Sequence, residues 1–360
     1  MAVAPMANPA MPFHPFSPSF PSNSSRLRWL NMTKPSFPVF SCSSAAFDEA
    51  PPALLRTEVS LSVGTHLIPH PAKVDKGGED AFFVSNHNGG VIAVADGVSG
   101  WAERNINPAV FSQELMANAS CLVGDVEGDP CLLLGKAHAA TSSIGSATVI
   151  IAMLEKNGIL KIANVGDCGL RVLRKGEIVL SSSPQEHYFD CPFQLSSESG
   201  GQTYEDAAVN ILEVMEGDTI IMGSDGLFDN VFDQEIISTV SEFDGASEIA
   251  KALANLACKH SGDKDFESPY SLEARSQGYD VPLWKKILGM KLTGGKPDDI
   301  TVIVARVNEL FVKVQFSFSR LEKAESCAEK GFPFMKVCGL LATIMGMDTL
   351  TIYMTSMHVL

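Results

Sequence analysis

The sequence predicts an α+β fold in which antiparallel β-sheets are covered by helices. Four apolar segments between residues 147 and 180 follow one another across short turns that contain glycine, and strands joined in this way must run antiparallel. The segments with helical spacing form two blocks and do not alternate with single strands, which argues against a βαβ array. With 45% hydrophobic and 19% charged residues among 360, the chain can also bury a large core.

The N-terminal half supplies three strands and then two helices. The third strand is the continuous apolar run GVIAVA, which a turn at Asp96 terminates. In the first helix Phe111 and Leu115 fall on one face, and Pro108 stands near its start. The strands are expected at Glu58–Val63, Asp80–Ser85 and Gly90–Ala95, and the helices at Asn107–Cys121 and Cys131–Ala140.

The second half adds further strands and a second block of helices. Its apolar runs are separated by the turns KNG, GDCG and RKG, and a long polar loop follows from Ser181 to about Ala207. The strands are expected at Ala147–Leu154, Leu160–Val165, Leu170–Arg174, Glu177–Leu180, Asn210–Val214, Asp218–Gly223 and Ile300–Val307, and the helices at Val231–Val240, Ala246–His260 and Ser268–Gln277.

The composition argues against several classes of partner and site. Against 27 Lys and Arg stand 42 Asp and Glu, a net charge of −15, so neither a nucleic acid nor an anionic membrane surface is expected as the main partner. The eight cysteines have no CxxC spacing, which favours reduced thiols over a zinc site or a disulfide framework.

Residues 1–47 differ in composition from the rest of the chain. They contain no Asp or Glu, nine Ser and eight of the 20 Pro, and their charged residues are Arg26, Arg28 and Lys34. A Ser-rich, weakly basic segment without acids is typical of an organellar transit peptide, and this composition favours the chloroplast over the mitochondrion. A disordered tail without a targeting role stays an alternative.

Acidic residues stand at the ends of the predicted strands, and in a sandwich such ends can converge on one rim. Carboxylates that share a site cannot all stay ionised unless a cation neutralises them, and oxygen ligands without His or Cys favour Mg²⁺ or Mn²⁺. A single Asp-Gly after a strand is usually only a tight turn, but that explanation is weaker for five clusters. The clusters are Glu79–Asp80, Asp96, Asp167, Asp225 and Asp298–Asp299.

Six motifs, in their order along the chain, resemble those of the metal-dependent type 2C protein phosphatases. Two further stretches, at His187–Leu195 and Ser268–Gly278, are similar to the small organellar branch of that family. The resemblance implies a four-layer α-β-β-α sandwich and a phosphatase domain at 48–308. The motifs are GGEDAFF (Gly77–Phe83), VADGVSGW (Val94–Trp101), GSAT (Gly145–Thr148), NVGDCGLRV (Asn164–Val172), GSDGLFDN (Gly223–Asn230) and GGKPDDITVIV (Gly294–Val304).

The resemblance also implies a centre of two Mg²⁺ or Mn²⁺ ions. Asp96 matches the residue that bridges both ions, and the carbonyl of Gly97 matches a ligand of one of them. Glu79 matches another ligand of that same ion, whereas Asp225 and Asp298 match ligands of the other. Two such cations lower the pKa of a bridging water and give a hydroxide for in-line attack on phosphorus.

Further acids are assigned by the same resemblance. Asp80 matches an acid that orients the metal-bound waters and so belongs to the catalytic set with Asp96. Asp167, together with Asp225, matches a weaker third metal position. Asp299 stands where many relatives have Asn and is expected to support the site.

Two positions depart from the family pattern. Many relatives carry a His directly after the Asp-Gly, which protonates the leaving oxygen, and here that position is Val98. His187 could replace it, although an ordinary loop His is the more common case. Many relatives also hold the phosphate with an Arg where this chain has Asp75, so Lys76 or Lys73 is expected to supply the positive charge.

Residues 309–360 lie beyond the family motifs. Their uninterrupted apolar part, Val337–Met347, is shorter than the roughly 20 residues of a membrane-spanning helix, so no transmembrane helix is expected. A membrane anchor, a helix that binds a partner and a tail unrelated to the phosphatase domain all stay open.

The sequence therefore predicts a chloroplast Ser/Thr protein phosphatase that depends on Mg²⁺ or Mn²⁺. The resemblance alone implies that its substrates are phosphothreonines of thylakoid membrane proteins, including those of photosystem II, and that it lies in the stroma or at the stromal face of the thylakoids. Two alternatives are a pseudophosphatase that binds phosphoproteins without hydrolysis, favoured by the missing His and Arg, and a hydrolase of small phosphate esters.

Overall fold

The computed structural model describes residues 57–282, 286, 290–312, 314–315 and 351–352. The transit peptide predicted at 1–47 and most of the extension predicted at 309–360 lie outside these residues. Within the described ranges, no helix combines the length and the apolar character needed to cross a membrane.

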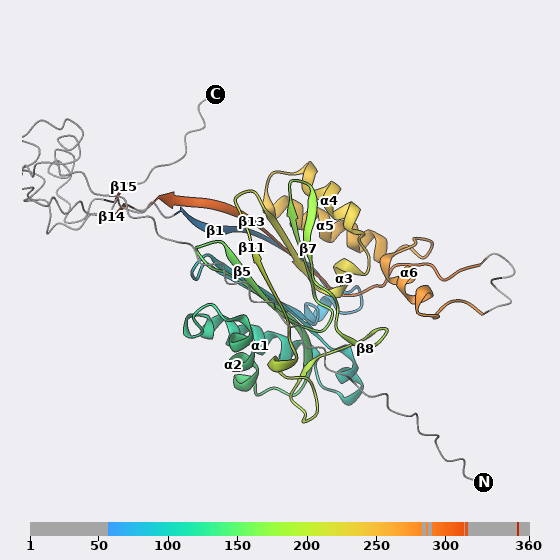
Figure 1. Ribbon diagram of the computed structural model, residues 1–360. Coiled ribbons are helices and arrows are strands. Elements are labelled where there is room, and N and C mark those ends of the chain that lie inside the picture. Colours follow the sequence, from blue (N-terminus) through green and yellow to red (C-terminus); the bar gives the residue numbers. More distant parts are fainter. Residues whose placement is uncertain (1–56, 283–285, 287–289, 313, 316–350, 353–360) are drawn as a thin grey trace, which may run out of the picture. The chain divides into compact units, whose positions relative to one another are not determined.

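Two antiparallel β-sheets form the centre of the fold, with helices on both outer sides (Figure 1). One sheet has the strand order β1-β13-β12-β6-β7, and the other has the order β11-β5-β4-β3-β2, with β10 paired to β4. The first contains β1 (Thr57–Ile68), β13 (Ile300–Val312), β12 (Thr219–Gly223), β6 (Gly169–Arg174) and β7 (Glu177–Ser181). The second contains β11 (Ala208–Glu213), β5 (Ile159–Val165), β4 (Ser146–Leu154), β3 (Gly90–Gly97), β2 (Asp80–Ser85) and β10 (Leu195–Ser196).

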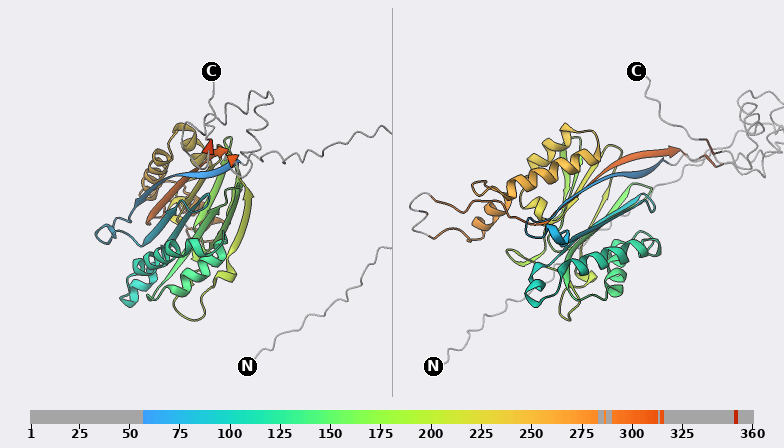
Figure 2. Two further views of the ribbon diagram at one scale, coloured as in Figure 1. Left: turned by 90° about the vertical axis from the view of Figure 1, so that its left-hand side faces the viewer. Right: turned by 180° about the vertical axis from the view of Figure 1, so that it is seen from behind.

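Helices of two separate blocks cover the two sheets (Figure 2). α1 and α2 pack on the sheet that contains β3, whereas α5 packs on β1 and β13. Both α1 and α2 begin with a proline, and the side chains of Asn107 and Asp129 cap their first turns. The helices are α1 (Pro108–Leu122), α2 (Pro130–Ala140), α3 (Asp225–Phe228), α4 (Asp233–Glu242), α5 (Ala246–Ser261) and α6 (Pro269–Ser276), with 3₁₀ turns at Val74–Lys76, Ser99–Arg104, Val123–Asp125 and Tyr204–Asp206.

Three apolar layers separate the four structural layers. Alternate residues of β3 serve different layers: Val91 and Ala93 face α1 and α2, whereas Ile92 and Val94 face the other sheet. A third layer lies between β12–β13 and helices α3 to α5. Because both faces of each sheet are covered, the central strands are continuous apolar runs although the sheets are antiparallel. The predicted α+β class with four layers is thereby confirmed.

The strand pair β1–β13 is longer than the sequence predicts. β1 was expected to end at Val63, but it continues to Ile68 because β13 pairs with it over its full length. A Cβ atom at Gly64 would lie 2.2 Å from the backbone nitrogen of Ser247, so glycine allows α5 to begin directly against the strand. β13 in turn runs to Val312, past the end predicted at Val307.

The segment predicted as a polar loop between Ser181 and Ala207 contains short strands. β8 (Glu186–Tyr188) and β9 (Cys191–Pro192) form a hairpin, in which Asp190 has a φ of 61°. These strands carry no alternating apolar pattern, so the sequence gives no signal for them.

A further two-residue strand, β14 (Val314–Gln315), pairs with β15 (Thr351–Ile352).

Candidate active site

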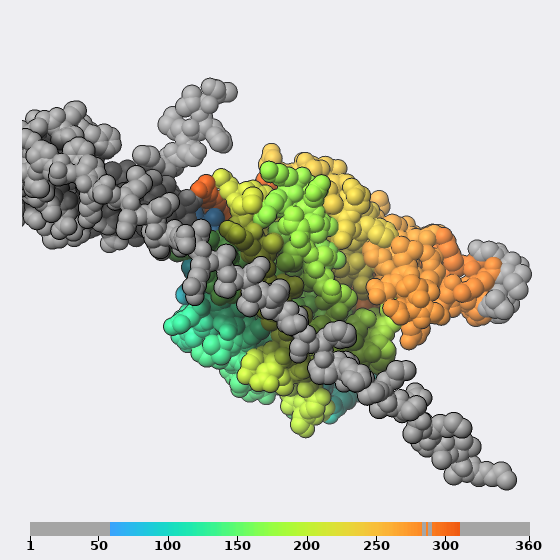
Figure 3. All heavy atoms as spheres, viewed as in Figure 1, coloured from blue at the N-terminus to red at the C-terminus, as the bar shows by residue number. Residues whose placement is uncertain are grey.

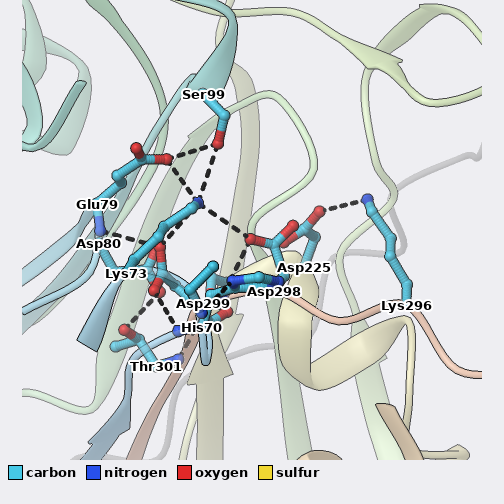
Figure 4. A network of polar contacts seen from close by, with 12 residues as sticks. His70, Lys73, Glu79, Asp80, Ser99, Asp225, Lys296, Asp298, Asp299 and Thr301 are labelled. Atoms are coloured by element: carbon cyan, nitrogen blue, oxygen red, sulfur yellow. Dashed lines mark hydrogen bonds and ion pairs between the residues drawn. The ribbon is translucent and has the colours of Figure 1, made fainter. Parts of the chain in front are cut away.

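The predicted acids lie where strands of both sheets end, at one rim of the layer between the sheets. Asp80 and Asp96 are direct partners in the β2–β3 pair. Asp225 follows β12 and begins α3, and Asp298 precedes β13; both of these strands belong to the other sheet. Asp167 stands in the turn between β5 and β6. The fold thus brings together residues that are far apart in the chain (Figure 4).

Asp80 links the two sheets at this rim. Its side chain is buried, and Thr301 of β13 donates a hydrogen bond of 2.6 Å from Oγ1 to Asp80 Oδ2. The other oxygen, Oδ1, has no hydrogen-bond partner in the described part of the chain. A buried carboxylate oxygen without a partner lowers the stability of the folded protein. This atom is therefore suited to bind a cation or to accept a hydrogen bond from a water molecule.

Asp299 is almost fully buried and organises the backbone before β2. Its carboxylate accepts hydrogen bonds from the backbone nitrogens of His70, at 2.7 Å, and Glu79, at 2.9 Å. These contacts fix the position from which the Glu79 side chain extends. The predicted supporting role of Asp299 agrees with this arrangement.

Lys73, and not Lys76, reaches the acidic rim. Its ammonium group lies 2.6 Å from Glu79 Oε2 and 3.2 Å from Asp299 Oδ2, and it donates to Ser99 Oγ at 3.0 Å. Burial opposes its charge, but the hydrogen bond to Glu79 and the neighbouring carboxylates raise the pKa of Lys73 above its ordinary value. Lys76 is exposed and makes no ion pair within the described residues. Of the two lysines that the sequence proposes, Lys73 is therefore the one whose ammonium group lies at the acidic rim.

Lys296 neutralises the other end of the rim. Its ammonium group lies 2.7 Å from Asp225 Oδ2 and 3.0 Å from one oxygen each of Asp190 and Asp229. Burial lowers the pKa of Lys296, but the charges of Asp225 and Asp229 outweigh it and raise the pKa overall. Lys296 and Asp229 lie within family motifs and Asp190 lies within the stretch 187–195, but no local pattern in the sequence distinguishes these three residues as members of the site.

The carboxylates disfavour one another's ionised forms. Burial, followed by the charges of Asp80 and Asp225, raises the pKa of Asp96 well above its ordinary value. Burial raises the pKa of Asp80 to about 7, although the hydrogen bond from Thr301 opposes the rise. Burial and then the charge of Asp225 raise the pKa of Asp298 to about 6. Positive charge at the rim would therefore favour the ionised forms of these groups.

The residues present suit a hard divalent cation. The available ligands are all oxygen atoms, and Asp225, like Asp80, has a buried carboxylate oxygen without a partner among the described residues. A Cβ atom at Gly97 would lie 2.8 Å from the carbonyl oxygens of Glu79 and Pro108, so a glycine is needed where its carbonyl is predicted to bind an ion. Within the described ranges, no three His, Cys, Asp or Glu side chains already surround one point as a metal site; ammonium groups lie among the carboxylates instead.

Three further positions from the sequence analysis can be placed. Val98 is half-buried in extended conformation at the end of β3. His187 is exposed on β8, and its ring contacts Gln202 at 3.2 Å and packs at a tilt against Phe193, so the structure gives no support to His187 as the acid. Cys168 is buried, and burial together with the charge of Asp96 raises the pKa of its thiol well above the ordinary value. It packs as a small neutral residue and is not activated as a nucleophile.

Known proteins resemble this chain closely. A probable protein phosphatase 2C 26 of Arabidopsis thaliana is 62% identical over 280 residues, which are 77% of this chain and 93% of that protein. A probable protein phosphatase 2C 1 of Oryza sativa subsp. japonica is 66% identical over 259 residues, which are 71% of this chain and 78% of that protein. No family model matches the chain.

The X-ray structure of the photosystem II phosphatase PBCP is similar in fold and sequence. It is 67% identical, with a TM-score of 0.67, and the match covers 69% of this chain and 98% of that one. These identities extend over nearly the whole of two of the related proteins, and the six motifs lie on the strand ends that form the acidic rim. The chain belongs to the metal-dependent type 2C family of Ser/Thr protein phosphatases.

Proposed function

We propose that this phosphatase acts in the chloroplast on phosphothreonines of thylakoid membrane proteins, including those of photosystem II. The convergence of acids from five strand ends on one rim supports the catalytic part of the proposal. The likeness to a photosystem II phosphatase supports the substrate, and the acid-free composition of residues 1–47 supports the location.

The rim would hold two divalent cations, Mg²⁺ or Mn²⁺. Asp96 would serve both, with Glu79 and the carbonyl of Gly97 on one side, and Asp225 and Asp298 on the other. When bound, such ions supply a hydroxide for attack on phosphorus at neutral pH. A third, weaker position would use Asp167 together with Asp225.

The side chains around the ions would position the reactants. Asp80, held by Thr301, would orient water at the centre of the rim. Lys73 would supply the positive charge that many relatives place on an Arg, because its ammonium group already lies among Glu79, Asp299 and Ser99. A lysine is a point charge and not a bidentate fork, so phosphate recognition by Lys73 would be less directional.

The test is phosphate release by the full chain from a phosphothreonine peptide and from an aryl phosphate. Each substrate is assayed with Mn²⁺, with Mg²⁺ and with excess chelator. The proposal expects release from the peptide that requires a divalent ion. Full activity in chelator would refute the metal-dependent mechanism.

The same assay separates the two alternatives. A pseudophosphatase would bind the phosphopeptide and release no phosphate from either substrate, whereas a hydrolase of small esters would cleave only the aryl phosphate. The buried, unpartnered oxygens of Asp80 and Asp225 favour a working metal centre over the first alternative.

A further inference from the structure

A pocket opens beside the acidic rim, between the β8–β9 hairpin and α6. The hairpin contributes Glu186 and Phe189, and α6 contributes Tyr270 and Glu273. The deep end is shared with the rim and includes Asp225 and Lys296, and the β5–β6 turn completes the lining. In space-filling view the surface of the α6 segment projects beside this end of the sheets (Figure 3). A substrate bound at the rim would therefore extend towards this pocket.

One wall of the pocket is aromatic. The ring of Phe189 lies 5.3 Å from that of Tyr270 and 5.2 Å from that of Tyr279, measured between centroids. The ammonium group of Lys296 already lies 5.2 Å from the Tyr270 ring. Aromatic rings grouped in this way offer faces that attract a cation and an apolar surface for an alkyl stem.

Two carboxylates of the pocket have no cationic partner among the described residues, Glu186 and Glu273. Burial, and then the charges of Glu273 and Asp190, raise the pKa of Glu186, which indicates that these acids face a common space. The two cations of the lining are already engaged: Arg171 pairs with Asp233 at 2.9 Å, and Lys296 pairs with three aspartates. The pocket therefore has an excess of negative charge at its outer part.

Asp225 gives a second indication that the deep end binds a ligand. It is 8% exposed, lines the pocket, and has one carboxylate oxygen without a partner in the described part of the chain. If this oxygen binds a cation, the reacting phosphate would lie at the deep end. The two acids Glu186 and Glu273 would then contact a neighbouring part of the substrate.

We propose that this pocket binds a basic side chain, Lys or Arg, that flanks the phosphorylated residue of the substrate. The inference rests on the proposed phosphatase function and specifies which proteins the site prefers. The alkyl stem would pack on Phe189, and the cationic group would meet Glu186 and Glu273. The flanking residue would lie within about three positions of the phosphothreonine, since an extended chain advances about 3.3–3.6 Å per residue.

Neither an acidic nor an apolar side chain fits the pocket as well. An acidic one would be repelled by the two unpaired carboxylates. A large apolar one would remove those carboxylates from water without giving them a partner, which is unfavourable. Since ion pairs at partly exposed sites and cation–π contacts each contribute little, the preference should be about fivefold. It should appear in KM rather than kcat, because the contact is distant from the reacting atoms.

The experiment uses the full chain and a set of phosphothreonine peptides that differ at one flanking position, which carries Lys, Ala or Glu. Turnover is measured in Mg²⁺, and the affinity of fluorescent versions is measured by anisotropy in Mg²⁺ and in chelator. The variant Glu186→Gln/Glu273→Gln removes both charges without changing side-chain size. Glu216→Gln is the matched control, because Glu216 is an exposed acid at the β11–β12 turn.

We expect at least one position where Lys gives about fivefold higher kcat/KM and affinity than Ala, and where Glu gives lower values. This ratio should fall to about one in the double variant, persist in Glu216→Gln, and shrink at high salt. A ratio near one in the wild type, or one that the double variant retains, overturns the inference. If no peptide or aryl phosphate is hydrolysed, the proposed function fails, while the anisotropy ratio still decides the pocket's preference.

Discussion

At the scale of the residue, Asp96 is crowded by like charges, and Asp96→Asn should therefore have opposite effects in two assays. The change removes the carboxylate proposed to bridge two ions, so turnover of a phosphothreonine peptide should fall at least about 100-fold in saturating Mn²⁺. It also relieves repulsion with Asp80 and Asp225, so the variant should melt at a higher temperature than the wild type in chelator. Asp244→Asn, at an exposed site, is the control. A variant that keeps its turnover, or melts lower in chelator, would contradict this assignment.

The residues of the rim differ in how far the sequence could predict them. Asp96 is the penultimate residue of β3 and Asp225 lies two positions beyond the end of β12, so their place at the rim is set by local sequence. Lys296 neutralises the rim through ion pairs with three aspartates on other segments. No local sequence pattern predicts these contacts. Between Lys73 and Lys76, only the backbone path of the 3₁₀ turn at Val74–Lys76 decides which side chain points inward.

At the scale of the element, Lys296 ties the β8–β9 hairpin to α3 through Asp190 and Asp229. Lys296→Gln leaves these carboxylates without a cation, so the metal-free protein should lose about 1–2 kcal/mol of stability. Amide hydrogen exchange in residues 186–192 should become faster, because Asp190 anchors the hairpin. Lys291→Gln is the control, since Lys291 forms a more exposed ion pair with Glu267. Unchanged exchange in the hairpin would show that its own contacts with α6 suffice to hold it.

Elements with a strong apolar period were predictable, and those fixed by tertiary contacts were not. β3 and β4 are apolar on both faces, and their expected positions agree with the structure to within two residues. α3 was not predicted, because its four residues are too few to show a helical period. The hairpin of β8 and β9 is held by packing against Tyr270 and carries no pattern of its own.

At the scale of the whole molecule, the carboxylates of the rim should make the metal-free protein less stable as pH rises. Bound metal ions should reverse this dependence. The folded pKa values of Asp80 and Asp298, about 7 and 6, lie above the ordinary value of about 3.9 in the unfolded chain. The folded state therefore binds more protons, and stability falls as pH rises from about 4 through 7. In chelator the melting temperature should be higher at pH 5.5 than at pH 8. Glu114 and Asp280, with pKa values lowered to about 2, titrate below this range.

Mn²⁺ should reverse that trend, because bound ions favour the ionised carboxylates. Thermal scans with and without Mn²⁺ at both pH values are the measurement. A melting temperature in chelator that rises between pH 5.5 and pH 8 would mean that the two lysines already neutralise the rim.

The location of the protein is tested with residues 1–48 fused to a fluorescent reporter. Because residues 1–47 of this segment contain no Asp or Glu and are rich in Ser and Pro, it should direct the reporter to chloroplasts. A reporter that stays in the cytosol would identify the segment as a tail without a targeting role. Import into mitochondria would keep the transit peptide and exclude thylakoid proteins as substrates.

The pairing of Asp80 with Asp96 in the β2–β3 ladder has a consequence for how the chain reaches its active form. Alternate residues of β3 face different apolar layers, so a slip by one position would turn the Asp96 carboxylate away from the rim. A chain folded in the wrong register would be unable to bind its ions at that position. Only molecules with the correct strand register would bind the metal ions. Molecules in the wrong register would lack activity altogether and would not hydrolyse other phosphate esters without selectivity.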